Sequence, residues 1–345
     1  MDTVTNRAED PPATRPVLLA LDWGTSSLRA FLMDASGAIV DQRASAHGIQ
    51  NLPVAGIAGF ERAFAELCGD WLSRWPGLPV VAGGMVGSAQ GWKEAPYVAC
   101  PADTQSLASR AVSVDSALGV PILIAPGLMF APDEDAPDGG APDVIRGEEI
   151  QIAGALAEHP TWASQACMAM PGTHSKWVRI KDGRIVGFAT YMTGELFAVL
   201  CKHSILGRLM PEGVPADAAA AAAAFVSGVQ AARDSRPGDL PHQLFATRTL
   251  GLTRRMAPEL LKDYLSGLLI GHELVSGSAR MQEALDGDTP LLLIGEGALC
   301  RRYGQALSVL GIKPAAQIGN TAPRGLFQFA VAAGLIVPAK ETLHD

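Results

Sequence analysis

The sequence predicts an α/β protein made of two similar halves, and two observations lead to this prediction. The chain has 345 residues, more than one hydrophobic core usually organises, and 48% of them are hydrophobic. The same pattern of strand, Gly-Thr-containing turn and strand also occurs twice, once near the start and once after Pro160. Two such hairpins, each opening a domain-sized segment, indicate two related domains.

The first hairpin covers residues 18–32. An apolar run leads to Asp22, the chain turns through Gly-Thr-Ser-Ser, and it leaves as a strand with alternating apolar residues at 28, 30 and 32. A glycine lets a phosphate approach the backbone, hydroxyl and amide groups donate to its oxygens, and an aspartate can hold Mg²⁺ through water. The same residues are ordinary turn formers, so the turn alone leaves both interpretations open.

Composition and charge exclude several classes of partner. A formal net charge of −8, with no compensating cluster of Lys or Arg, gives no general attraction to nucleic acid or anionic lipid. An anionic substrate must therefore meet local cations or backbone donors. The five cysteines are scattered and never spaced as C-x-x-C, which favours free thiols in a reducing cytoplasm over disulfides or zinc ligands. No apolar run reaches transmembrane length, so we expect a cytoplasmic protein.

The rest of the first half alternates strands and helices. A Ser-Gly-Ala turn leads into a third antiparallel strand predicted at 39–43, and apolar residues at helical spacing predict a helix at 60–75. A short apolar strand at 79–82 runs into a glycine-rich segment. The Asp-, Pro- and Gly-rich residues 132–143 are expected to form a loop that moves, and a helix is predicted at 147–159.

The second half opens on the recurring pattern. Strands are predicted at 167–170, 177–180 and 185–191, with a Gly-Thr-His-Ser turn between the first two. Asp217 precedes seven alanines. Because alanine is the best helix former and aspartate a good N-cap, we predict a surface helix without chemistry there. A long amphipathic helix is predicted at 260–280.

A third element combines a buried-type strand at 290–294, a Gly-Glu-Gly turn and a helix at 301–310. This order usually suggests a dinucleotide-binding fingerprint, but the third glycine position holds Cys300 and no opening βαβ unit is evident. A turn whose backbone meets a nucleotide base or ribose explains the glycines equally well, and a plain connection between strand and helix is also open.

In this order the three elements resemble the phosphate 1, phosphate 2 and adenosine motifs of the actin-like ATPase superfamily, which includes sugar kinases, hexokinase and heat-shock chaperones. Finer motifs narrow the resemblance to the 2-dehydro-3-deoxygalactonokinase family, over nearly the whole chain. The motifs that carry it are Leu21-Asp22-Trp23-Gly24-Thr25-Ser26-Ser27-Leu28-Arg29, Ala82-Gly83-Gly84-Met85-Val86-Gly87-Ser88, Arg146-Gly147-Glu148-Glu149-Ile150-Gln151 and Met170-Pro171-Gly172-Thr173-His174-Ser175-Lys176-Trp177.

The resemblance implies two actin-like (ribonuclease-H-like) α/β domains with a nucleotide and substrate cleft between them. It places the N-terminal domain, with phosphate 1 and the sugar acid site, at 16–165, and the C-terminal domain, with phosphate 2 and the adenosine site, at 166–323. A C-terminal helix at the hinge and a tail follow at 324–345. Residues 1–15 lack the basic and apolar regions of a signal peptide and are expected to form a flexible arm.

The resemblance also implies an activity, the ATP-dependent phosphorylation of 2-dehydro-3-deoxy-D-galactonate on its 6-hydroxyl. The product, 2-dehydro-3-deoxy-6-phosphogalactonate, belongs to galactonate and galactose catabolism. ATP and Mg²⁺ are the implied cofactors. The chain carries neither the P-loop pattern nor the kinase glycine-rich loop, so the hairpins must hold the phosphates. The expected partners are small molecules, with no nucleic acid and no membrane, and a homodimer is left open.

Glu148 stands where glycerol and xylulose kinases carry the aspartate of a Gly-Asp-Gln-Gln element. The resemblance therefore implies that Glu148 is the catalytic base, with Asp22 as a second catalytic residue that holds Mg²⁺ through water. Glu149 is an alternative base, and two glutamates at an exposed helix N-terminus are also favoured by the helix dipole alone. The implied ATP phosphate ligands are Gly24, Thr25, Ser26, Ser27, Gly172, Thr173, His174 and Lys176, and the implied adenosine ligands are Gly295, Glu296 and Gly297. The implied sugar acid ligands are Gly84, Met85, Gly87, Ser88, Trp92 and Arg146.

Other functions stay open at this point. The chain could be a kinase for another 2-keto-3-deoxy sugar acid or sugar, because one inverted hydroxyl is distinguished by only a few hydrogen bonds. It could also be an actin-like ATPase switch without kinase activity, or a dinucleotide-dependent oxidoreductase, an alternative that depends on Gly295-x-Gly297 alone.

Overall fold

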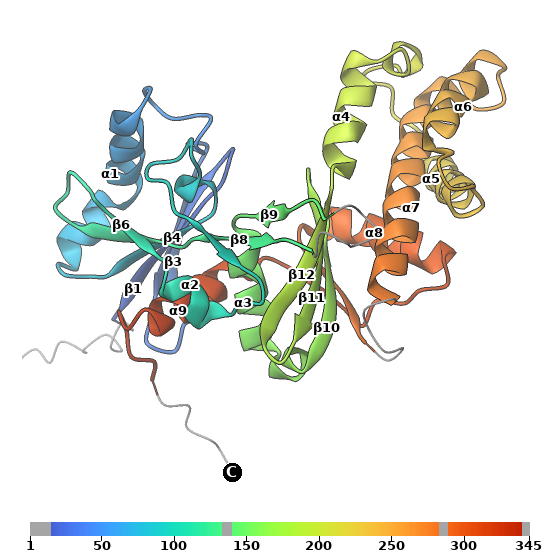
Figure 1. The fold of residues 1–345 in the computed structure, drawn as a ribbon. Coiled ribbons are helices and arrows are strands. Elements are labelled where there is room, and N and C mark those ends of the chain that lie inside the picture. Colours follow the sequence, from blue (N-terminus) through green and yellow to red (C-terminus); the bar gives the residue numbers. More distant parts are fainter. Residues whose placement is uncertain (1–14, 133–139, 283–288, 340–345) are drawn as a thin grey trace, which may run out of the picture. The chain divides into compact units, whose positions relative to one another are not determined.

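The computed structural model describes residues 15–132, 140–282 and 289–339. The arm predicted at 1–15 lies outside the described residues except for Arg15, as do most of the loop predicted at 132–143 and the end of the predicted tail. The chain divides into two compact units, one formed by the residues up to Pro160 together with those from Thr321 onward, the other by Thr161–Asn320 (Figure 1).

A six-stranded sheet forms the centre of the first unit, in the order β3-β2-β1-β4-β7-β6. The first three strands pair antiparallel, β1, β4 and β7 run parallel, and β6 returns antiparallel to β7. The predicted hairpin and third strand are thereby confirmed. The strands are β1 (Leu18–Trp23), β2 (Leu28–Met33), β3 (Ile39–Ser45), β4 (Val80–Gly83), β6 (Val112–Asp115) and β7 (Pro121–Ile124).

The central strands are buried on both faces, whereas the sequence indicated a single apolar face on the second one. Phe31 and Met33, which alternate with the predicted apolar positions, are 4% and 0% exposed. The reason is that helices cover both faces: α1 packs against one side of β1, and α9 packs against β1 and β4. The helices of this unit are α1 (Ile57–Arg74), α2 (Thr104–Ala108), α3 (Glu148–Glu158) and α9 (Ala322–Ala332), with the 3-10 turns η1 (Met85–Gly87) and η2 (Pro160–Ala163) near its sheet and at its boundary.

A second, three-stranded sheet lies in the same unit, with the order β5-β8-β9. It consists of β5 (Tyr97–Ala99), β8 (Gly127–Phe130) and β9 (Asp143–Ile145). Because β9 ends one residue before Arg146, this small sheet fixes the point at which the chain enters α3.

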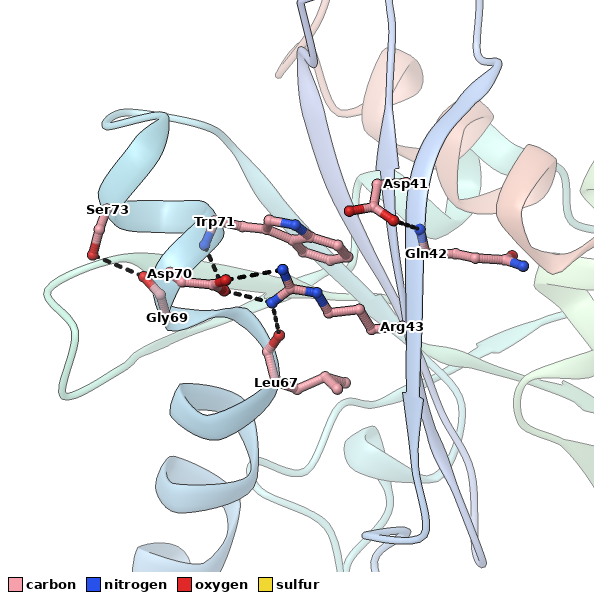
Figure 2. Close-up of polar contacts among 8 residues, drawn as sticks. All are labelled: Asp41, Gln42, Arg43, Leu67, Gly69, Asp70, Trp71 and Ser73. Carbon is pink, nitrogen blue, oxygen red and sulfur yellow. Dashed lines mark hydrogen bonds and ion pairs between the residues drawn. The ribbon is translucent and has the colours of Figure 1, made fainter.

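Arg43 fastens the edge strand β3 to α1, as Figure 2 shows. Its guanidinium donates to the Leu67 carbonyl at 2.9 Å and to both carboxylate oxygens of Asp70, and it lies 4.0 Å from the centre of the Trp71 ring. This ion pair lowers the pKa of Asp70. The edge strand β3, most of which is exposed, is thus tied to a helix through one arginine.

The second unit repeats the strand order of the first. Its five-stranded sheet runs β12-β11-β10-β13-β14, with the first three strands antiparallel and β10, β13 and β14 parallel. The strands are β10 (Gln165–Met170), β11 (Ser175–Lys181), β12 (Arg184–Tyr191), β13 (Leu291–Ile294) and β14 (Ala316–Ile318). The helices are α4 (Thr193–His203), α5 (Ala218–Arg233), α6 (Leu240–Leu252), α7 (Leu261–Gln282) and α8 (Gly297–Val309), with η3 (Gly207–Leu209) and η4 (Pro258–Leu260).

Two helices of the second unit differ from their prediction. Asp217 caps α5 as expected, accepting the Ala220 N–H at 2.9 Å, but the helix is not only a surface element: Phe225 and Val229 are buried against α7. The helix α8 begins at Gly297, four residues before the predicted start. Glu296 makes this start possible, because its carboxylate accepts two free N–H groups of the first turn.

Among the described residues, no helix is both long and apolar enough to cross a membrane.

The helices α3 and α9 approach each other through two glycines. A Cβ atom on Gly325 would lie 1.8 Å from the Ile150 carbonyl oxygen, and one on Gly154 would lie 2.0 Å from the Thr321 carbonyl oxygen. The Thr321 hydroxyl also donates to the Gln151 carbonyl at 2.6 Å. Backbone therefore rests directly on backbone at this crossing, and any side chain would push the helices apart.

We expect Gly325→Ala to destabilise the protein by about 1–3 kcal/mol, the usual cost of overpacking a tight contact. Gly69→Ala is the matched control, since it lies within α1 and its Cβ would meet only the end of Leu118, at 4.0 Å. There alanine should add up to about 1 kcal/mol of stability. Urea unfolding of both variants tests this, and equal effects would contradict the close contact.

Candidate functional site

The predicted phosphate 1 turn lies between β1 and β2 and is supported from behind. The Gly24 N–H donates to the Ser27 carbonyl at 3.0 Å, and the amides of Ile49 and Gln50 donate to the carbonyls of Gly24 and Thr25. These bonds use the carbonyl groups of the turn. The hydroxyls of Thr25, Ser26 and Ser27 are therefore the groups left to meet a ligand in the predicted site.

Asp22 lies in β1 directly opposite Arg29 of β2. Arg29 Nη2 lies 3.0 Å from the buried Asp22 oxygen Oδ2, so this oxygen is the one that forms the ion pair. Burial raises the pKa of Asp22, and the Arg29 charge opposes that shift. A carboxylate paired with one arginine can still accept a hydrogen bond from a water that is bound to a cation.

The described residues contain no cluster of three or more His, Cys, Asp or Glu side chains that could hold a metal. Asp22 would therefore contribute one carboxylate to a metal held mostly by other oxygens. Mg²⁺ is bound in this way in phosphate sites, through one or two carboxylates, substrate phosphates and water. The donor set in this unit fits Mg²⁺ better than a metal that needs a full protein cage.

Arg146 is the most informative cation of the first unit. Its Nη2 donates to the Ala95 carbonyl at 2.9 Å, and its guanidinium lies 4.4 Å from the centre of the Tyr97 ring. Nε and Nη1 are buried and have no hydrogen-bond partner among the residues that the structure describes. Leaving a buried charged donor unpaired costs free energy, so these two N–H groups indicate a place for an anionic ligand.

Ser88 and Gly87 share this position. The Ser88 hydroxyl is also buried without a partner, and a Cβ on Gly87 would lie 3.1 Å from Arg146 Nη1. The structure thus brings together Gly87 and Arg146, two of the residues predicted to bind the sugar acid. Gly84 and Met85 precede Gly87 in the chain: Gly84 is the N-cap of η1, and Met85 is its first residue.

Tyr97 was missed by sequence reasoning. Tyr97 belongs to β5, and its ring packs against Gly127 of β8. A Cβ on Gly127 would lie 2.7 Å from the ring, so glycine is needed for the ring to contact Arg146. No local pattern in the sequence signals this contact, because it arises from the pairing of β5 with β8.

Trp92 requires a correction. It is 6% exposed and packs with three aromatic rings of the core, those of Trp23, Phe60 and Phe64, at centroid distances of 5.5–6.0 Å within this cluster. Aromatic burial of this extent stabilises the core. The indole is therefore not available to line a sugar site.

Glu148 and Glu149 follow Arg146 at the start of α3 and have different surroundings. The Arg146 amide donates to Glu148 Oε2 at 3.1 Å, and the Glu148 side chain is half-buried. Glu149 is completely buried, and both of its carboxylate oxygens accept the Gly147 N–H, at 2.7 and 2.8 Å. Gly147 adopts a φ of +104°, which favours glycine.

The prediction that both glutamates lie at an exposed helix N-terminus is therefore wrong for Glu149. Burial raises the pKa of Glu149 to about 8, and the negative charge of Glu148 adds to this shift. Both effects disfavour the ionised form. The sequence could not show this difference, because the two residues are identical in type and adjacent in position.

A pocket of about 630 Å³ lies within the second unit. It brings the phosphate 2 turn and the adenosine turn together, since Gly172, Thr173 and Glu296 all line it. Gly295 of the adenosine turn lies next to the phosphate 2 turn, because a Cβ on it would be 3.4 Å from the Pro171 carbonyl oxygen. The volume suits a nucleotide-sized ligand. The full lining is Pro171, Gly172, Thr173, Thr193, Gly194, Phe197, Lys262, Asp263, Ser266, Leu269, Ile270, Glu296, Leu299, Arg302 and Tyr303.

Three predicted residues of this unit have local partners of their own. His174 Nε2 pairs with the Glu195 carboxylate, and the Lys176 ammonium donates to the His174 carbonyl at 2.7 Å. Neither side chain lines the pocket. Glu296 lines it but uses both carboxylate oxygens to cap α8, and these bonds lower its pKa.

Sequence reasoning missed the pocket residues contributed by helices. Lys262, Asp263 and Ser266 come from α7, and Arg302 of α8 forms a 3.0 Å ion pair with Asp263. Helical periodicity marks which residues of α7 are apolar, but not which polar residues turn toward the adenosine turn. That depends on how α7 and α8 pack.

The class of protein is an actin-like fold of the sugar-kinase type. Three features define it: the repeated strand order, the turns that follow β1 and β10, and the pocket beside the second turn. The family model described as 2-keto-3-deoxy-galactonokinase matches residues 22–329. A curated relative from Escherichia coli (strain K12), a 2-dehydro-3-deoxygalactonokinase, is 36% identical over 305 residues, which cover 88% of this chain and 94% of the relative.

A probable 2-dehydro-3-deoxygalactonokinase from Rhizobium meliloti (strain 1021) is 37% identical over 306 residues, covering 88% of this chain and 93% of the relative. The crystal structure of a Sinorhizobium meliloti protein assigned as a 2-dehydro-3-deoxygalactonokinase superposes with a TM-score of 0.76 at 33% identity, covering 91% of this chain and 98% of that one. The chain belongs to the 2-keto-3-deoxy-galactonokinase family. It is an ATP-dependent carbohydrate kinase, and both the family resemblance and the predicted fold class are confirmed.

The buried carboxyl of Glu149 should make folding stability depend on pH. Its folded pKa of about 8 lies above the value of 4.5 for an unperturbed glutamate, so the folded state binds more protons than the unfolded state between these limits. Stability should therefore fall as pH rises from about 5 to 8, by at most about 1.4 kcal/mol per pH unit from this group.

Glu149→Gln removes the titration while keeping an acceptor for the Gly147 amide. Urea unfolding at several pH values should show a flatter profile for Glu149→Gln than for the wild type across this window. Parallel profiles would show that the Glu149 carboxyl is ionised at its ordinary pKa.

Proposed function

We propose that this chain transfers the γ-phosphoryl group of ATP to the 6-hydroxyl of 2-dehydro-3-deoxy-D-galactonate, giving 2-dehydro-3-deoxy-6-phosphogalactonate. The observation that carries the proposal is the Arg146 guanidinium, whose Nε and Nη1 atoms are buried and have no hydrogen-bond partner among the described residues. A sugar acid carries the carboxylate that such a group would bind. The family of the chain supports the same substrate.

In this proposal the sugar acid lies on the first unit. Arg146 pairs with its carboxylate through Nε or Nη1, because a charged guanidinium donor makes a strong hydrogen bond to a carboxylate. Ser88 donates a further hydrogen bond, and Gly84, Met85 and Gly87 leave backbone close to the ligand. Tyr97 and the Ala95 carbonyl hold the guanidinium in place and do not contact the substrate.

ATP lies in the pocket of the second unit. The adenosine part meets the turn of Gly295, Glu296 and Gly297, and the phosphates extend toward Gly172 and Thr173. The Gly-Thr-Ser-Ser turn of the first unit would donate to a phosphate group through its hydroxyls. His174 and Lys176 support the second turn through their contacts with Glu195 and the backbone.

Asp22 would hold Mg²⁺ through water, using its largely buried carboxylate. When bound, Mg²⁺ neutralises charge on the transferring phosphoryl group. Asp22 supplies a fixed negative group next to the phosphate 1 turn, and its strand position keeps it there. Arg29, its ion-pair partner, keeps the carboxylate oriented.

Glu148 is the proposed base. Its carboxylate is half-buried and held by the Arg146 amide, whereas both oxygens of Glu149 are engaged at the Gly147 amide and are fully buried. Glu148 takes the proton of the 6-hydroxyl as the oxygen forms its bond to the γ-phosphorus. The bond from that phosphorus to the bridging oxygen breaks, and ADP leaves with the electron pair.

We further propose a cytoplasmic location, which the five free cysteines support.

The function is tested by coupled ADP release with a panel of acceptors that includes 2-dehydro-3-deoxy-D-galactonate, its gluconate epimer, aldoses and polyols. We expect the galactonate-derived acid to give the highest kcat/KM. A higher value for the epimer would move the specificity to that acid. ATP turnover without any dependence on an acceptor would instead support a nucleotide-driven switch.

The roles at the start of α3 can be separated by steady-state kinetics. Glu148→Gln should lower kcat by about 10²–10⁴ with little change in the KM for the sugar acid, because a base acts in the transition state. Arg146→Lys should instead raise the KM for the sugar acid, since a single ammonium cannot present two donors in a plane. If Glu149→Gln is the inactive variant, the base is Glu149 and the assignment of Glu148 is wrong.

A further inference from the structure

Glu273 is a buried carboxylate in the middle of α7, and it is 3% exposed. The Trp177 indole N–H donates to its Oε1 at 3.0 Å, and the Tyr303 hydroxyl donates to its Oε2 at 2.7 Å. Burial raises the pKa of Glu273, while hydrogen bonds from Thr193, Tyr303, Trp177 and Ser175 oppose the shift. Four neutral donors around one carboxylate make a connected polar network inside the second unit.

Two of the four donors, Thr193 and Tyr303, line the proposed nucleotide pocket, and the other two lie on β11, which begins next to the phosphate 2 turn. Ser175 is the first residue of β11 and directly follows the phosphate 2 turn. Thr193 is the first residue of α4 and lines the pocket. Tyr303 lies on α8, the helix that follows the adenosine turn, and it also lines the pocket. The Ser175 and Tyr303 hydroxyls lie 2.9 Å apart, which closes the network between the two turns.

The start of α4 is in turn tied to the phosphate 2 turn. The Glu195 N–H donates to the Thr173 carbonyl at 3.0 Å, and a Cβ on Gly194 would lie 2.5 Å from the Gly172 carbonyl oxygen. A displacement of Thr193 would therefore move the backbone that faces the phosphates.

The helix α7 cannot shift easily to relieve a lost bond. One turn after Glu273, a Cβ on Gly277 would lie 2.4 Å from the Trp177 ring, so the helix lies directly on the indole. The carboxylate and this glycine together set the position of Trp177, which is 1% exposed.

We propose that Glu273 is a positioning residue for nucleotide binding, which holds the phosphate 2 turn, the start of α4 and α8 at the separations that ATP requires. The inference rests on the assignment of this pocket to ATP in the proposed function. Glu273 does not line the pocket and does not contact the nucleotide. It acts through Ser175, Thr193 and Tyr303, so that the pocket is formed before ATP arrives.

Glu273→Gln is the first test. The glutamine side chain keeps the shape of glutamate, but one of its two terminal groups is an N–H donor that faces another donor. Because that hydrogen bond is lost, the phosphate 2 and adenosine turns should lose their fixed spacing. We expect the KM for ATP and the Kd for ADP, measured by calorimetry, to rise at least about tenfold. The KM for the sugar acid should stay within about twofold, because its proposed site lies in the other unit.

Leu268→Ala is the matched control on the same helix. Leu268 is fully buried in a different apolar cluster, away from the network, so its truncation should lower the melting temperature. A purely structural role for Glu273 would make the two variants alike, with lower stability and an unchanged Kd for ADP. A higher Kd for ADP in Glu273→Gln alone supports positioning.

Ser175→Ala decides the matter if Glu273→Gln does not fold. Ser175 is completely buried and does not line the pocket, so any loss of nucleotide affinity must come through the network. We expect a rise of about two- to fivefold in the Kd for ADP. An unchanged Kd in folded Ser175→Ala, or in folded Glu273→Gln, overturns the proposal.

The same measurements separate this inference from the proposed function. A wild-type protein that binds ADP but phosphorylates no acceptor would contradict the proposed function, while the Kd series still tests Glu273. A wild-type protein that phosphorylates the sugar acid, with variants of unchanged KM and Kd, would contradict the role of Glu273 alone.

Discussion

The site of the first unit depends on the direct backbone contact between α3 and α9. Gly154 and Gly325 allow it, because each would place a Cβ within about 2 Å of a carbonyl oxygen of the other helix. The chain leaves this unit at Pro160 and returns at Thr321, so the contact joins residues far apart in sequence. Since α3 begins with Glu148, the last helix of the chain fixes the position of the proposed base.

Each unit places a buried carboxylate behind its site, and burial raises the pKa of both. Glu149 is satisfied by a backbone amide in a glycine turn, while Glu273 is satisfied by four side chains from three elements. Burying such a group is costly unless donors surround it, and it then specifies one arrangement of those donors. The two units share a strand order but fix their turns by different chemistry: local backbone in the first, a network between helices and strands in the second.

The sequence was sufficient for the parts of the fold that local patterns determine. Both hairpins, the long helix α7 and the Asp217 cap follow from periodicity, alanine content and capping chemistry. The early start of α8 was missed, because it depends on both oxygens of Glu296 turning back onto the helix. Tertiary contacts decided the rest: whether Trp92 is core, whether Glu149 is buried, and which residues of α4 and α7 line the pocket of the second unit. The roles assigned to site residues remain predictions, since they concern ligands.

The segment from Arg146 to Glu149 contains both the residue proposed to bind the substrate carboxylate and the proposed base. The guanidinium of Arg146 is fixed by Tyr97 and the Ala95 carbonyl, while its own amide donates to Glu148. The next amide, that of Gly147, is held by Glu149. Arg146, proposed to bind the carboxylate of the sugar acid, and Glu148, the proposed base, are therefore both positioned by hydrogen bonds of consecutive peptide groups. A shift of this segment would move Arg146 and Glu148 together. In the proposed complex, the distance between the group that binds the carboxylate and the base at the 6-hydroxyl would therefore be preserved.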